Sequence, residues 1–260
     1  MELVIFDTNA YRYLVADIDF DQVEKAITKL KAKEAKNKIQ TLISPIVVKE
    51  LLAHLADKND PSFEKCLKAN KALYLHSSFG KSYRMIASPE LLIGQSFFGK
   101  TIPSKVSTNL ALGQISYHLA TNPTPHIFKK FQRNLNLNRD HVLESELNFA
   151  VSMKQFLQTA DPTSTGWRVF ENDEIGRAKT LAGIRSEKAS IEIALGYLFI
   201  VYSQLVQSGQ IQLMPNQELI DRAKAFLSVF PEPIALYKNV MENLVNSCIS
   251  PLKSWTKLYN

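Results

Sequence analysis

The chain opens with a short apolar run that stops abruptly at a polar tripeptide. Leu3–Phe6 is continuous and rich in β-branched residues, a pattern typical of a parallel strand that is covered on both faces. Asp7–Asn9 (Asp-Thr-Asn) ends this run, and the pattern then becomes helical. Asp21–Lys38 carries apolar residues at helical spacing with lysines between them, and Ile39–Ile43 follows as a second short apolar run. The pattern therefore predicts strand, helix and strand in succession.

A helix-start signal follows the second predicted strand. Ser44 can accept from free N–H groups at a helix start, and Pro45 is tolerated at the first helical position. The predicted helix, Pro45–Ala56, carries Glu50. Beyond it the pattern is mainly helical, and the predicted helices are Phe63–Leu75, a short helix within Ser88–Lys105, Thr108–Ala120, Arg139–Thr159, Glu171–Ile184, Ser186–Gln207, Asn216–Val229 and Pro233–Tyr259.

These elements predict an α/β fold, with a parallel sheet core and a large, mainly helical remainder. We expect one domain over residues 1–260, with a strand–helix–strand–helix front at 1–58 and a helical insertion or extension at 63–260. Candidates for later strands are few. Ile211–Met214 is the best of them, and Trp167–Phe170 is another.

The net charge of the chain indicates a class of binding partner. The chain has 31 Lys and Arg against 25 Asp and Glu, a net charge of +6, which is compatible with a polyanion such as RNA. Within Asp21–Lys38 the lysines favour a solvated helix face, with an RNA contact as the alternative. Phe128–Arg139 mixes cations and aromatic residues, which suits either the edge of an amphipathic helix or a surface for single-stranded RNA.

The cysteines and the apolar segments indicate the cellular compartment in which the protein is expected. Cys66 and Cys248 match no metal or redox spacing, and two reduced thiols predict a cytoplasmic protein. Residues 1–10 lack the basic start of a signal peptide. Ile191–Val206 is the most apolar segment, but it contains Glu192 and is short for a membrane span, so we expect a buried helix and no membrane partner.

Two acidic residues follow the predicted strands. Asp7 comes at the end of the first strand, and Glu50 lies on the helix that leaves the second. Ligands of open α/β sheets bind outside the carboxyl ends of the strands, so both carboxylates are expected to face one crevice. Mg²⁺ often takes one or two carboxylates together with waters and phosphate oxygens. The pair therefore predicts a site for Mg²⁺ or Mn²⁺.

These residues are also where the chain resembles a known family. An apolar strand followed by Asp7–Asn9, and a second strand followed by Ser44–Leu52 (Ser-Pro-Ile-Val-Val-Lys-Glu-Leu-Leu), are similar to the first two acidic motifs of PIN-domain ribonucleases. That family includes the toxins of bacterial toxin–antitoxin pairs. The resemblance covers about the first 55 residues.

The resemblance implies roles for several residues. Asp7 and Glu50 would be metal ligands, and Asn9 or Thr8 would orient Asp7 or a bound water. Members of the family have a third acidic residue at the start of a later helix, for which Glu187 and Glu192 are the candidates.

Each role has a structural alternative. Asp7 can instead cap a helix, and Glu187 can serve in the first turn of one. Glu192 stands out because it is an acid on an otherwise apolar segment, and a buried carboxylate is costly unless it is paired or binds a metal.

The function expected from this reading is metal-dependent endoribonuclease activity, that is, hydrolysis of phosphodiester bonds in single-stranded RNA. A protein antitoxin is a partner that follows from the resemblance alone. Two alternatives remain open at this point. One is a catalytically incomplete PIN-like scaffold that binds RNA or protein, and the other is an unrelated helical interaction protein.

Overall fold

The structure is a computed structural model that describes residues 2–79, 82–83, 85–161, 170 and 173–247. The chain divides into two compact units, each built from two segments. Unit 1 comprises Met1–Leu92 and Thr101–Glu146, and unit 2 comprises Ile93–Lys100 and Leu147–Asn260.

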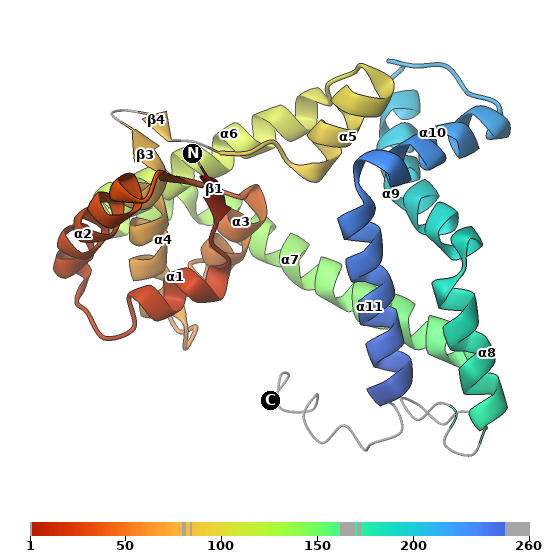
Figure 1. The fold of residues 1–260 in the computed structure, drawn as a ribbon. Coiled ribbons are helices and arrows are strands. Elements are labelled where there is room, and N and C mark those ends of the chain that lie inside the picture. The colour runs from red at the N-terminus through yellow and green to blue at the C-terminus, as the bar shows by residue number, and fades with distance from the viewer. Residues whose placement is uncertain (1, 80–81, 84, 162–169, 171–172, 248–260) are drawn as a thin grey trace. The chain divides into compact units, whose positions relative to one another are not determined.

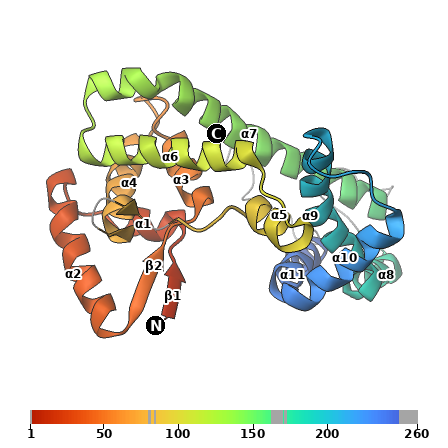
Figure 2. The same ribbon diagram turned by 90° about the horizontal axis from the view of Figure 1, so that it is seen from above.

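Unit 1 contains the two predicted strands. β1 (Glu2–Ile5) and β2 (Ile39–Leu42) pair in parallel, with Glu2 opposite Ile39 and Ile5 opposite Leu42. They lie side by side in the view of Figure 2. Because the strands are parallel, the segments that follow their carboxyl ends leave from the same edge of the pair.

Helices make up most of the rest of unit 1 (Figure 1). They are α1 (Thr8–Leu14), the short 3₁₀ helix η1 (Phe20–Gln22), α2 (Val23–Lys36), α3 (Pro45–Ala53), α4 (Phe63–Ser77), α6 (Pro103–Thr121) and the first part of α7 (Pro125–Ala160). Two short antiparallel strands, β3 (Ser78–Phe79) and β4 (Ser82–Tyr83), follow α4. The core of unit 1 is apolar and draws on all of these helices, with fully buried side chains that include Tyr11, Ile27, Leu51, Leu73, Leu119 and Leu135.

The expected α/β class is wrong. The structure is mostly helical, and among the described residues β1 and β2 form the one parallel sheet. β1 is not covered on both faces either, since Leu3 is 58% exposed and Ile5 is 48% exposed. A continuous apolar run predicts a strand but does not determine what covers that strand.

The later strands that a larger sheet would need are also missing from the described residues. Ile211–Met214 is irregular, and the backbone N–H of Met214 donates to the Tyr202 hydroxyl at 2.9 Å instead of to another strand. Of the second candidate, residues 167–169 lie outside the described part of the chain.

All the regular secondary structure in the described residues of unit 2 is helical. It contains most of α5 (Pro89–Phe98), the second part of α7, α8 (Glu174–Arg185), α9 (Glu187–Gln207), α10 (Asn216–Val229) and α11 (Pro231–Ser247). Lys238 of α11 fastens the corner between α8 and α9, because its ammonium donates to the carbonyls of Arg185 and Ser186 and to the hydroxyl of Ser190.

Helix α9 is the apolar segment for which a buried helix was expected. One face is buried, through Ala194, Leu198, Val201, Tyr202 and Leu205. The opposite face is open, with Phe199 59% and Ile200 55% exposed. Within the described part of the chain, α9 is the one helix with the length and apolar composition of a membrane span. The buried core helix of a soluble protein can have the same length and composition.

Candidate functional site

Asp7 stands just beyond the carboxyl end of β1, where the chain turns into α1. Its backbone is extended, and its carboxylate Oδ1 accepts a hydrogen bond from the N–H of Ala10 at 2.6 Å. Asp7 is therefore the N-cap of α1, the alternative that the sequence left open. The side chain is exposed, and Oδ2 has no hydrogen-bond partner among the described residues.

Glu50, in the second acidic motif, lies on α3 next to the segment that contains Asp7. The sequence predicted the start of its helix correctly, since Ser44 accepts from the N–H of Ile46 and Pro45 occupies the first turn of α3. The hydroxyl of Thr8 donates to Oε2 of Glu50 across 42 positions of sequence. The two motif segments thus meet, with Asp7 next in sequence to the residue that binds Glu50.

Asn9 lies in the first turn of α1, and its side chain is exposed. Asn9 or Thr8 was expected to orient Asp7 or a bound water, whereas the contact that Thr8 makes is to Glu50. Asn9 makes no side-chain hydrogen bond to the rest of the described protein.

The candidates for a third acid belong to unit 2. Glu187 is an exposed residue in the first turn of α9, behind the N-cap Ser186, whose hydroxyl accepts from the N–H of Ala189. Glu192 is exposed rather than buried, and its carboxylate lies 3.8 Å from the ammonium of Lys188 one turn away. The cost of burying a carboxylate, which singled out Glu192, therefore does not apply.

The donor set at the edge suits a cation held by two carboxylates. Asp7 Oδ2 and Glu50 Oε1 have no protein partner among the described residues, and both are of the ligand type that Mg²⁺ and Mn²⁺ prefer. No group of three or more His, Cys, Asp or Glu side chains with the arrangement of a metal site occurs in the described ranges. In Mg²⁺ sites with one or two protein carboxylates, waters and substrate oxygens complete the coordination.

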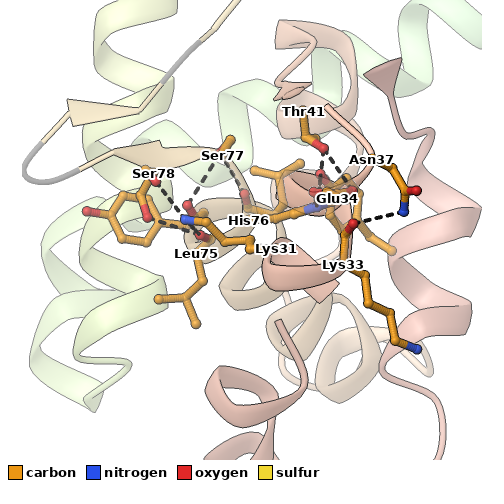
Figure 3. A network of polar contacts seen from close by, with 12 residues as sticks. Lys31, Lys33, Glu34, Asn37, Thr41, Leu75, His76, Ser77 and Ser78 are labelled. Atoms are coloured by element: carbon orange, nitrogen blue, oxygen red, sulfur yellow. Dashed lines mark hydrogen bonds and ion pairs between the residues drawn. The ribbon is translucent and has the colours of Figure 1, made fainter. Parts of the chain in front are cut away.

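A buried polar network lies behind this edge. The ring of His76 on α4 is fully buried, with Nδ1 3.1 Å from the Tyr11 hydroxyl and Nε2 2.8 Å from Oε2 of Glu34. The hydroxyl of Thr41 on β2 donates to Oε1 of Glu34 at 3.2 Å. Figure 3 shows how Glu34, His76 and Thr41 converge from three elements.

One assignment of protons satisfies every member of the network. A neutral His76 accepts from the Tyr11 hydroxyl at Nδ1 and donates from Nε2 to Glu34, which also accepts from Thr41. Burial lowers the pKa of His76, although Glu34 acts in the opposite direction. Burial, followed by the charge of Glu34, raises the pKa of Tyr11. The network therefore ties α1, which carries the Asp7 cap, to α2, β2 and α4.

This network was not predicted from the sequence, although one signal was present. Val23, Ile27 and Leu30 repeat at helical spacing on α2, and Glu34 continues that apolar register. A carboxylate on the inward stripe of a helix calls for a buried partner. His76, 42 positions away, is that partner.

No protein-family model, no curated protein and no solved structure matches this chain.

Proposed function

We propose that the protein is a divalent-cation-dependent phosphodiesterase that hydrolyses RNA at the edge formed by Asp7 and Glu50. The observation that carries this proposal is the hydrogen bond from Thr8 to Glu50, which brings the two acidic motif segments together beside the exposed Asp7. The activity is the one that the resemblance of these segments implies.

Each residue has a defined part in this proposal. Asp7 and Glu50 hold Mg²⁺ or Mn²⁺, which when bound polarises a phosphodiester and lowers the pKa of a coordinated water. Thr8 fixes the orientation of Glu50 by occupying Oε2, so that Oε1 is left for the ion. The hydrogen bond from the N–H of Ala10 occupies Oδ1 of Asp7 and fixes the orientation of that carboxylate, so that Oδ2 is left for the ion.

A second candidate is RNA binding without catalysis. It is favoured by the finding that the described residues hold no group of three or more metal-ligating side chains. In that case the exposed Asp7 serves only as the cap of α1, and the chain retains a surface for RNA but does not cleave it.

Calorimetric titration with Mn²⁺ separates the two candidates. If the proposal holds, the wild-type chain binds Mn²⁺ saturably, and Asp7→Asn and Glu50→Gln each weaken binding by at least about ten-fold, because each removes one charged ligand. The same two variants lose Mn²⁺-dependent cleavage of single-stranded RNA.

Glu64→Gln is the matched control. Glu64 is an exposed carboxylate of α4 in the same unit, so its loss changes the net charge equally but leaves the edge intact. We expect this variant to bind Mn²⁺ and to cleave RNA like wild type. Negligible Mn²⁺ binding by the wild-type chain would reject the enzyme and leave the binding module.

A further inference from the structure

The outer face of α2 carries a row of free cations. Lys25, Lys29, Lys33 and Lys36 are all exposed, and we call them the lysine stripe. At about 100° per residue they fall within roughly 80° of the helix circumference. The inward face, which contains Val23, Ile27 and Glu34, lies on the opposite side. The four lysines therefore form one continuous surface.

None of the four ammonium groups has a partner among the described residues. Lys31 lies on the same helix but is bonded to the protein. The ammonium of Lys31 donates to the carbonyls of Leu75 at 3.0 Å and Ser78 at 2.8 Å. Figure 3 shows Lys33 pointing away from the network in which Lys31 and Glu34 take part. The lysine stripe thus does not serve the packing of unit 1.

The arrangement also works against the stability of the helix. Like charges four residues apart on a helix repel, and the stripe contains two such pairs, Lys25 with Lys29 and Lys29 with Lys33. The helix dipole favours cations only in the last turn, which includes Lys33 and Lys36. It accounts for neither Lys25 nor Lys29, so the first half of the stripe has no structural explanation.

The connection between α2 and β2 sets the direction of the stripe relative to the strand pair. Helix α2 passes directly into β2 through residues 37 and 38, so the two elements run in opposite directions. In Figure 2 the helix and the strand diverge from this connection at an acute angle. The amino end of α2, with Lys25, therefore lies toward the edge at which β2 ends, and Lys36 lies toward the opposite edge.

We propose that the lysine stripe binds the phosphate backbone of single-stranded RNA and guides it toward the Asp7–Glu50 edge. The choice of RNA as the polyanion rests on the proposed function. A membrane surface fits less well, because a helix that lies in a bilayer interface exposes large apolar side chains, whereas the apolar residues of α2 face the core. Repeated cations that track a backbone are the usual means of binding single strands.

The test is the salt dependence of RNA binding. Binding of a fluorescently labelled RNA of about 20 nucleotides, followed by anisotropy between about 50 and 200 mM KCl, gives the slope of log K against log salt. EDTA in the buffer prevents metal-dependent cleavage. Replacing Lys25, Lys29, Lys33 and Lys36 together by Gln is expected to reduce the magnitude of this slope by about 2 to 3, since each phosphate contact on a single strand contributes about 0.7.

A matched variant controls for net charge. Lys100, Lys154, Lys179 and Lys224 are exposed lysines of unit 2 without a described ion pair, and replacing all four by Gln removes the same charge. This control is expected to keep the wild-type slope. Replacing the stripe by Arg is expected to keep RNA binding as well, because the charges remain.

Three results would overturn the proposal. The slope would be unchanged in the stripe variant, or it would fall equally in the control, or the stripe variant would lose binding to phosphatidylserine vesicles while keeping its RNA affinity. Failure of the proposed function is detected in a separate experiment, the Mn²⁺ titration. The salt slope is measured in EDTA, so a protein that binds no Mn²⁺ still gives a clear result for the stripe.

Discussion

At the scale of single residues, His76 shows how a buried group makes stability depend on pH. The folded protein holds this side chain neutral, with a pKa below its ordinary value of 6.5 because of burial. The unfolded chain therefore takes up a proton as the pH falls through about 6.5, while the folded chain does not. The free energy of unfolding should consequently decrease below that pH.

His76→Gln tests this expectation. The variant should be less stable at neutral pH by about 1–3 kcal/mol, because Tyr11 and Glu34 lose their buried partner. Its stability should also fall less steeply than that of wild type between about pH 7 and pH 5, since the titrating group is gone. Urea unfolding at several pH values measures both effects, with the exposed His126→Gln as control. Parallel pH curves for wild type and His76→Gln would contradict the assignment.

At the scale of elements, α1 allows the two roles of Asp7 to be separated. The cap bond to the N–H of Ala10 needs only a side-chain oxygen, which Asn also provides. Asp7→Ala should therefore lower the free energy of unfolding by about 0.5–2 kcal/mol, whereas Asp7→Asn should stay within a few tenths of a kcal/mol of wild type. Chemical denaturation of both variants gives the answer. Equal destabilisation would mean that the negative charge itself, rather than the cap bond, stabilises the helix.

Two helix starts were predictable from a serine that caps the helix. Ser44 with Pro45 opens α3, and Ser186 opens α9, both as expected. The N-terminal part of α7 was harder to predict, because the helix expected from Arg139 in fact begins at Pro125. Pro125 is the local signal for this start, because proline suits the first turn of a helix.

Contacts between segments that are distant in sequence were harder to predict from the sequence. The strands β1 and β2 were predicted, but the larger parallel sheet was not found in the described residues. The meeting of Thr8 with Glu50 and that of Glu34 with His76 each join residues 42 positions apart. Periodicity reports which face of a helix is inward, but it does not identify the residue that the face meets.

At the scale of the molecule, the two units differ in how they are built from the chain. The core cluster of unit 1 runs from Tyr11 to Leu135, so it lies within residues 1–146. In unit 2, helix α5 supplies contacts from a distant segment, including Phe97 against Phe226 and Phe98 stacked on Tyr202. A fragment that begins at residue 147 therefore lacks part of its own packing.

This difference predicts an asymmetry between fragments. Residues 1–146 should fold alone and unfold cooperatively, because their core is complete. Residues 147–260 should show a weaker, less cooperative transition, since they lack Phe97 and Phe98. Thermal unfolding followed by circular dichroism compares the two. A cooperative transition in the second fragment alone would show that the division of the core is not the one described.

The opposite faces of α2 also limit how this helix can change over evolution. Lys33 and Glu34 are neighbours in sequence, yet one belongs to the outward stripe and the other to the buried network. Deletion or insertion of a single residue before them turns everything that follows by about 100°. Such a change would bring lysines toward the core and move Glu34 away from His76. The helix can therefore vary in the side chains of its outer surface, whereas its length between Val23 and Glu34 is fixed by the need to keep both faces in register.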